Sequence, residues 1–331
     1  MGIPTEFQRI LQLGNRNLLL FGVFIAIAFG VRLPLSQEML TSYPLTTPLV
    51  ALIFIAQGLN MNFGQAGQLR KYLKIILAGT VIAVIAYPAM ASGFTKLFAL
   101  TDDFALGFIL ICCFPNSLEA AMAMTMSADG DRITAVVLLI GLSLVGIVSI
   151  PLNIFIWIGG AQGVSATMIL AKIFGYVFLP IFVGQILRRT FPTLPDKTKE
   201  LSHYVPILCL TVLVYISCSR EADLFHQLQL GDIVHTFFPS ATLHIVMLIL
   251  ALFTGKFLLK LNRKDNRSFI FITSEKPMSL SVALWSVTYA SSHPTSIFPI
   301  LVFYIGQMII DSFIISRLKL QDCLNNEKSA A

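Results

Sequence analysis

Charged residues are scarce in this sequence, and their scarcity excludes an ordinary soluble domain. Only 12% of the 331 residues are Asp, Glu, Lys or Arg, whereas about 25% is usual for a soluble domain. The long apolar runs also lack the alternation of apolar and polar residues that marks the strands of a transmembrane barrel. The sequence therefore predicts an integral membrane protein built from helices.

Motifs of catalysis and of metal binding are missing as well. The five cysteines have no zinc-type spacing, and the five histidines form no HExxH or similar pattern. Ser-His-Asp spacing and a phosphate-binding glycine loop are also absent. An enzyme that used Glu119 or Glu275 as a base would need a nucleophile or a metal site that the sequence lacks. We predict neither an enzyme nor a bound cofactor.

The apolar runs that fill the chain predict how often it crosses the membrane. A helical crossing takes about 20 residues, and this length gives ten crossings. We interpret the first as a retained helix and not as a cleaved signal peptide, because its removal would leave an odd number. The predicted crossings are 17–31, 44–60, 74–92, 104–127, 133–157, 165–187, 203–219, 236–258, 268–289 and 295–316.

The net charge of +6 follows membrane topology and does not indicate a nucleic-acid partner. When alternate loops are assigned to one side, starting with the N-terminus, that side holds eighteen of the 23 basic residues. The opposite side holds only Arg32, Lys96 and Arg220. By the positive-inside rule both termini are cytoplasmic. The short loops favour a bacterial inner membrane, and the oligomeric state stays open.

A glycine-rich, uncharged turn at 158–165 divides the chain into two halves. The halves 1–160 and 161–331 each contain five predicted crossings. An odd number per half reverses the direction of equivalent crossings. The sequence therefore predicts two inverted five-helix repeats.

The fourth and ninth crossings are each interrupted by a polar segment that contains a proline and a glutamate. The segments are 113–119, CFPNSLE, and 273–277, TSEKP. Pro115 and Pro277 remove backbone donors and oppose regular helix geometry. A carboxylate within an apolar span costs roughly 2.5–3.5 kcal/mol. Two matching breaks are typical of a transporter site built from discontinuous helices; the alternative is a structural kink whose glutamate reaches the lipid surface.

Polar side chains at the breaks are the predicted binding site. Asn116, Ser117, Thr273, Ser274 and Ser279 offer oxygens, and Glu119 and Glu275 would accept a cation, Na⁺ or H⁺. Lys276 would be a counter-charge, an anion-binding group or half of a structural ion pair. Gln307 fits cavity lining and helix–helix hydrogen bonding equally well. For His244 a structural role is favoured over a proton relay. For Asp311 a position toward the cytoplasmic interface is favoured over a role in the pathway.

Four stretches of the sequence carry a family resemblance: 54–69, 113–131, 271–280 and 307–317. They resemble the bile acid:sodium symporter superfamily, closest to its deep branch of bacterial homologues and the vertebrate member linked to calcium regulation. The likeness covers nearly the whole chain. It implies a panel domain of crossings 1, 2, 6 and 7 and a core domain of crossings 3–5 and 8–10. Broken crossings 4 and 9 would cross in the core, and alternating access would carry organic anions, often with sodium.

The sodium sites that the resemblance implies are only partly present. The symporters have a Ser-Asn pair after the first break, where this chain has Ala120 and Ala121. On the next helix only the hydroxyl of Thr134 is matched. In the ninth crossing Glu275 and Met278 match, while a glutamine is replaced by Ser279. One sodium site would be lost and the other weakened, and Lys276 would supply a fixed charge instead.

The sequence as a whole predicts a secondary active transporter of small organic anions, either bile-acid-like molecules or other amphipathic carboxylates and sulphates. Na⁺ or H⁺ would be the coupling ion. The main alternative is a sensor or regulatory membrane protein that keeps this fold and transports nothing. A passive channel is a further alternative.

Overall fold

The structure, a computed structural model, describes residues 21–42, 45–60, 72–159, 171–193, 199–220, 222–227 and 230–330. All regular elements in these ranges are helices. A helix satisfies its backbone hydrogen bonds within one segment, which is what continuous apolar runs require in a bilayer. The prediction of an all-helical membrane protein is confirmed for this part of the chain.

Among the described residues, five helices are long and apolar enough to cross a membrane. They are Leu73–Leu97, Arg132–Trp157, Ala171–Thr190, Gly231–Leu258 and Pro294–Asp322. Shorter apolar helices are Phe21–Arg32, Thr46–Asn60 and Tyr204–Arg220. Large apolar side chains on these helices, including Phe24, Val148 and Phe238, are more than half exposed. Such surfaces are suited to lipid and not to water, so the protein is a multi-pass membrane protein.

The chain divides into two compact units, and each unit takes segments from both halves of the sequence. Unit 1 consists of Met1–Met61, Ala171–Leu228 and Val282–Thr295. Unit 2 consists of Asn62–Leu170, Gln229–Ser281 and Ser296–Ala331. Predicted crossings 1, 2 and 7 and most of crossing 6 fall in unit 1, whereas crossings 3–5 and 8 and nearly all of crossing 10 fall in unit 2. The ninth is shared, because its second part belongs to unit 1.

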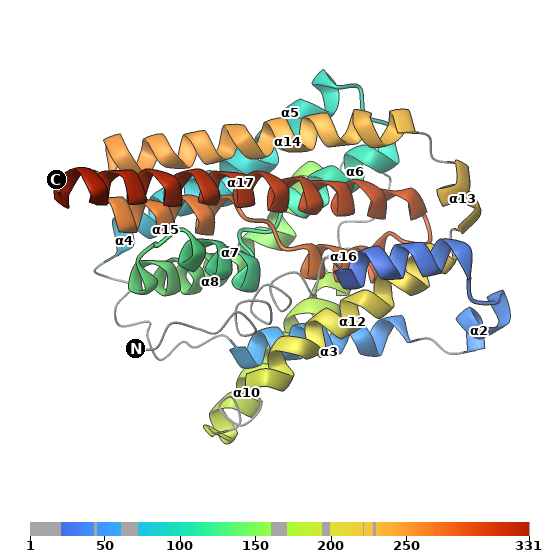
Figure 1. The fold of residues 1–331 in the computed structure, drawn as a ribbon. Coiled ribbons are helices and arrows are strands. Elements are labelled where there is room, and N and C mark those ends of the chain that lie inside the picture. Colours follow the sequence, from blue (N-terminus) through green and yellow to red (C-terminus); the bar gives the residue numbers. More distant parts are fainter. Residues whose placement is uncertain are drawn as a thin grey trace. The chain divides into compact units, whose positions relative to one another are not determined.

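Unit 1 is held together by close packing of α3 against α10 and α12 (Figure 1). Its helices are Phe21–Arg32, α2 (Gln37–Ser42), α3 (Thr46–Asn60), α10 (Leu179–Thr190), α12 (Lys199–Arg220) and α13 (Ala222–Gln227). Glycines permit the contact: a Cβ added to Gly58 would collide with the carbonyl oxygen of Ile181. The Arg188 guanidinium also donates to the carbonyl of Leu59 at 2.7 Å, where the end of α3 carries negative partial charge.

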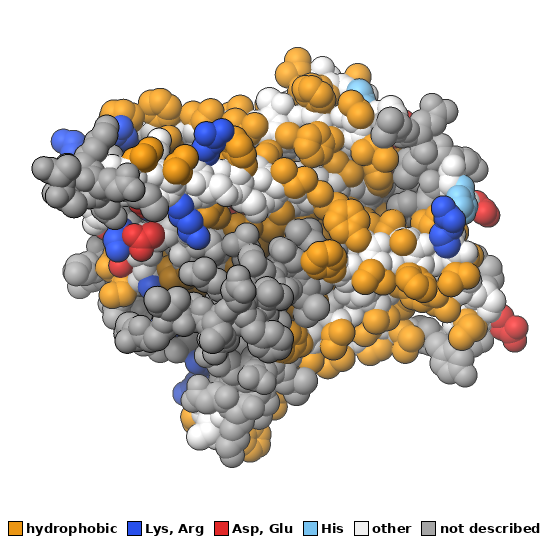
Figure 2. Space-filling model, in the orientation of Figure 1, with side chains coloured by type: hydrophobic (Ala, Val, Ile, Leu, Met, Phe, Trp, Pro, Cys, Tyr) orange, Lys and Arg blue, Asp and Glu red, His pale blue; other side chains and the backbone are white. Residues whose placement is uncertain are grey.

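Unit 2 contains both predicted breaks. Its helices are α4 (Leu73–Thr80), α5 (Tyr87–Leu97), α6 (Asp102–Cys112), α7 (Leu118–Ser127), α8 (Arg132–Trp157), α14 (Leu230–Phe253), α15 (Arg263–Ser274), the start of α16 (Met278–Thr288) and α17 (Ile297–Ala330). A π-helical turn, Val81–Ala86, joins α4 to α5. The long α17 packs along α14 and α6, and α15 packs against α7, α8 and α14. Figure 2 shows apolar side chains over the faces of α14 and α17, with basic side chains gathered near the end of α17.

Polar caps set the helix ends near this basic region. Asp131 accepts a hydrogen bond from the Thr134 amide at 2.7 Å and so caps α8. Asn262 caps α15 in the same way, as its residue type predicts. Arg267 donates two hydrogen bonds to the Asp322 carboxylate, at 2.8 and 2.9 Å. This bidentate pair ties the start of α15 to the last part of α17.

Candidate functional site

Both predicted helix breaks are present in unit 2. The chain leaves helical geometry at 113–117, between α6 and α7, and at 275–277, between α15 and α16. Ser117 (φ −96°, ψ 129°) and Glu275 (φ −73°, ψ 128°) are both extended. Pro115 and Pro277 lie within these segments, where their missing amides oppose regular helix geometry.

The two breaks contact each other through their backbones. The Ser117 amide donates to the Glu275 carbonyl at 3.2 Å. Asn116 is 4% exposed, and Glu275 and Lys276 are fully buried. A lipid-facing kink, the alternative considered for the second break, is therefore wrong for Glu275. Hydrogen-bonding groups from two interrupted helices meet inside unit 2.

Lys276 uses its ammonium group to satisfy freed backbone carbonyls. Its Nζ donates to Phe114 O at 2.8 Å, to Ala83 O at 3.0 Å and to Pro115 O at 3.4 Å. The same nitrogen lies 3.9 Å from the ring centroid of Tyr87. A buried ammonium is costly without such partners. Among the described residues Lys276 forms no ion pair with a carboxylate, so this geometry does not support the structural ion pair, and the role of Lys276 stays a prediction.

The carbonyl of Ala83 is available because of a proline one turn further on. Pro88 has no amide hydrogen, and the Tyr87 amide bonds to Ile82 O, five residues back. The missing amide of Pro88 and this longer hydrogen bond together leave the carbonyls of Ala83 and Val84 without their usual helix donors. Lys276 satisfies Ala83, and the side-chain amide of Asn153 donates to Val84 O at 2.9 Å.

Gln307, on α17, pairs with the backbone of the second break. The Lys276 amide donates to Gln307 Oε1 at 3.1 Å, and Gln307 Nε2 donates to Lys276 O at 2.8 Å. The side chain thus replaces the helix partners that Lys276 lost when the helix was interrupted. Of its two predicted roles, the geometry favours hydrogen bonding between segments over cavity lining.

Glu275 has an unusual environment for a buried acid. Among the described residues, no amide, hydroxyl or cationic group donates to either of its carboxyl oxygens, and the Asp311 carboxyl group is within hydrogen-bonding reach when one of the two acids holds a proton. Its carboxyl group interacts electrostatically with that of Asp311 on α17. A fully buried acid that lacks donors is a strong acceptor for a cation or a proton.

Asp311 belongs to a buried chain of side chains that sequence reasoning did not connect. Its Oδ1 lies 3.0 Å from His244 Nε2, and His244 Nδ1 lies 3.2 Å from the Tyr87 hydroxyl. Asp311 and His244 are fully buried, so the Asp311 carboxyl group lies inside unit 2 and not at a solvent-exposed surface. The signal in the sequence was an acid within an otherwise apolar crossing.

The remaining predicted residues divide by location. Asn116 is at the first break, and its Nδ2 has no partner among the described residues. Ser117 Oγ caps α7 by accepting from the Ala120 amide at 3.3 Å. Thr273 and Ser274 donate their hydroxyls to carbonyls of α15, Phe269 O at 2.7 Å and Ile270 O at 2.8 Å respectively. These two hydroxyls are therefore not free donors.

Thr134 is not brought to the breaks. Its hydroxyl donates to Asp265 Oδ1 at 2.7 Å, in the first turn of α15. About 15 Å of helix separates Asp265 from Glu275. Met278 is buried and Ser279 partly exposed at the start of α16, beside the second break. The side chain of Glu119 lies outside the described part of the structure, so its role stays a prediction.

Comparison with known proteins decides the family. The model of the SBF-like CPA transporter family matches residues 17–320. The chain belongs to this family. It is a family of transporters and not of enzymes, and the resemblance to bile acid:sodium symporters is confirmed.

Similar proteins of this transporter family come from plants and animals. One is the probable sodium/metabolite cotransporter BASS4, chloroplastic, of Arabidopsis thaliana, 22% identical over 95% of this chain and 77% of the relative. Another is sodium/bile acid cotransporter 7 of Mus musculus, 22% identical over 94% of this chain and 95% of the relative. The Danio rerio protein of the same name is 24% identical over 86% of each.

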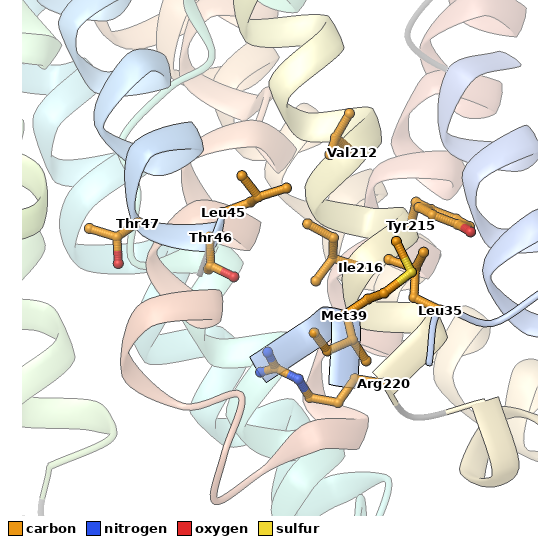
Figure 3. A pocket seen from close by; sticks show the side chains of 10 residues that line it. Leu35, Met39, Leu45, Thr46, Thr47, Val212, Tyr215, Ile216 and Arg220 are labelled. Carbon is orange, nitrogen blue, oxygen red and sulfur yellow. The ribbon is translucent and has the colours of Figure 1, made fainter. Parts of the chain in front are cut away.

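This SBF-like transporter also has a pocket within unit 1 that no sequence motif marked. Its volume is about 320 Å³, and its walls come from α2, the start of α3 and the end of α12 (Figure 3). Leu45, Val212 and Ile216 give it an apolar wall, while Arg220 is its charged side chain. An apolar wall beside a guanidinium is compatible with an amphipathic anion.

Proposed function

We propose that the protein is a secondary active transporter of small organic anions, with the paired helix breaks of unit 2 as its binding centre. The contact between Ser117 and Glu275 is the observation that supports this most strongly. It joins two interrupted helices next to a buried acid whose carboxyl group lies beside that of Asp311. Discontinuous helices that meet in this way are the usual construction of an ion and substrate site in secondary transporters.

Unit 1 is the panel and unit 2 the core of an alternating-access transporter. Five long helices, three shorter apolar helices and the broken pairs α6/α7 and α15/α16 together account for ten crossings. The halves 1–160 and 161–331 form inverted repeats, each with a broken fourth crossing. Both termini and the basic ends of α15 and α17 are cytoplasmic, and the membrane is a bacterial inner membrane.

The coupling cation, Na⁺ or H⁺, binds at Glu275. Its carboxyl group is adjacent to Asp311, and two carboxyl groups side by side favour a shared cation or proton. Asn116, Ser117, Glu119, Met278 and Ser279 complete the centre. The names of the plant and animal relatives support sodium, whereas the altered residues of the sodium sites support a proton.

The substrate is a small amphipathic anion. Relatives named as bile acid and metabolite cotransporters support a carboxylate or sulphate with an apolar body. The apolar pocket beside Arg220 supports the same chemical class.

Uptake into proteoliposomes tests this function. A panel of labelled bile acids, fatty acids and aryl sulphates is offered while sodium and pH gradients are imposed separately. We expect saturable uptake of at least one anion, accelerated by one of the two gradients. Uptake that never saturates would indicate a channel, and anion-dependent thermal stabilisation without uptake would indicate a sensor.

A further inference from the structure

The surroundings of the Lys276 ammonium have the composition of a monovalent-cation site. Three backbone carbonyls, from Ala83, Phe114 and Pro115, lie 2.8–3.4 Å from Nζ. An ammonium has three donors, so these oxygens use all of them. The Tyr87 ring completes the shell at 3.9 Å, within the range of a cation–π interaction.

The oxygens come from separate interruptions of the helical backbone. Phe114 and Pro115 belong to the break between α6 and α7, and Ala83 belongs to the π-helical turn before α5. Proteins hold unsolvated monovalent cations with convergent carbonyls of this kind, which lie where regular α-helix geometry is interrupted. A structural lysine would more simply pair with the neighbouring acid, yet Nζ contacts carbonyls and not Glu275.

We propose that Lys276 is a tethered cation that occupies a monovalent-cation site formed by these three carbonyls and Tyr87. Because the ammonium is covalently bound to the protein, the site cannot exchange its ion with solution. The consequence for transport depends on the proposed function: one cation that would otherwise be carried is replaced by a fixed charge. Glu275 then remains as the exchangeable acceptor.

Chemical rescue of a truncated lysine tests the site itself. Lys276→Ala removes the side chain beyond Cβ, and n-propylammonium has the same carbon and nitrogen atoms as the part removed. Lys276→Met is the matched control, because it fills the space without a charge. The full-length wild type and both variants are compared in detergent, with choline chloride as the reference salt at equal ionic strength.

We expect n-propylammonium to raise the Tm of Lys276→Ala by roughly 3–5 °C relative to choline. Sodium should stabilise this variant as well, by filling the emptied carbonyl shell. Wild type and Lys276→Met should respond to n-propylammonium by less than about 1 °C. Equal shifts in all three proteins, or no shift in Lys276→Ala, would overturn the proposal.

The proposal can also be tested if Lys276→Ala has a folding defect. If Lys276→Ala is not recovered as a monodisperse protein in choline, extraction in n-propylammonium becomes the measurement. Recovery in n-propylammonium alone supports the tethered cation, and recovery in neither salt counts against it. None of these measurements involves flux, so a failed uptake assay and a failed rescue are separate results.

Discussion

At the scale of single residues, Glu275 offers the most direct test of the binding centre, because its carboxyl group is fully buried beside that of Asp311. Glu275→Gln keeps the size of the side chain and removes its charge. We expect uptake to fall by at least about tenfold, which corresponds to roughly 1.4 kcal/mol in binding free energy. Membrane insertion should be unchanged and Tm unchanged or higher, because a buried charge is removed.

The matched control for this change is an acid outside the centre. Asp129 is 63% exposed and lies 3.3 Å from Lys264, a surface pair of little energetic value. Asp129→Asn should leave uptake unchanged. Wild-type uptake in Glu275→Gln would remove this acid from the mechanism.

The structural effects of residues that act locally could be predicted from the sequence. The effects of residues that contact partners far away along the chain could not. Pro115 and Pro277 interrupt a helix wherever they occur in its interior. The carbonyl of Ala83, however, is 193 positions from Lys276 and is freed only by Pro88. The hydrogen bond between His244 and Asp311 likewise spans 67 positions. Periodicity and composition contain no information about such pairings.

At the scale of elements, the π-helical turn before α5 predicts an energetic coupling between Pro88 and Asn153. Asn153→Leu leaves the buried Val84 carbonyl without its donor and should destabilise the protein by about 1–3 kcal/mol. Pro88→Ala restores a backbone amide to the helix, so Asn153→Leu should cost less in that background. Chemical unfolding of the two single variants and the double variant measures the coupling. Strictly additive effects would show that the proline does not free this carbonyl.

The packing of α6 against the short turn Pro294–Ser296, directly before α17, predicts a second effect at this scale. A Cβ added to Gly107 would collide with the carbonyl oxygen of Ser296, which is backbone and cannot move aside easily. Gly107→Ala should therefore lower the unfolding free energy by about 1–3 kcal/mol. Gly93, also helical, has no atom within 4 Å of an added Cβ, so Gly93→Ala should be neutral or stabilising. Similar Tm values for the two variants would contradict this view of the interface.

Element boundaries were predictable where apolar runs define them. The predicted crossing at 133–157 agrees closely with α8, and that at 104–127 covers α6 and α7. The predicted last crossing ends at 316, whereas α17 continues to Ala330. Its extension is polar, and the Arg267–Asp322 pair anchors it. An apolar run cannot reveal a helix end that is held by charged side chains.

At the scale of the whole molecule, the two units could not be derived from the hydropathy pattern. That pattern places crossings in order along the chain but contains no information about which crossings pack together. Each unit combines segments from both halves of the sequence. The grouping matches the panel and core that the family resemblance implied, apart from the divided ninth crossing. The family resemblance therefore indicated which crossings pack together, and the chemistry of single segments could not indicate this.

The distribution of basic residues predicts the orientation of the entire chain. Lys96 lies in the last turn of α5, on the side with few basic residues, and Lys264 lies in the first turn of α15, on the basic side. Both side chains are exposed, so single cysteines at these positions, in a background without native cysteines, would be accessible to label. In intact spheroplasts a membrane-impermeant maleimide should modify Lys96→Cys but not Lys264→Cys, because the basic side is cytoplasmic. Permeabilised cells, the control, should label both. The reverse pattern in intact cells would place both termini outside and contradict the positive-inside assignment.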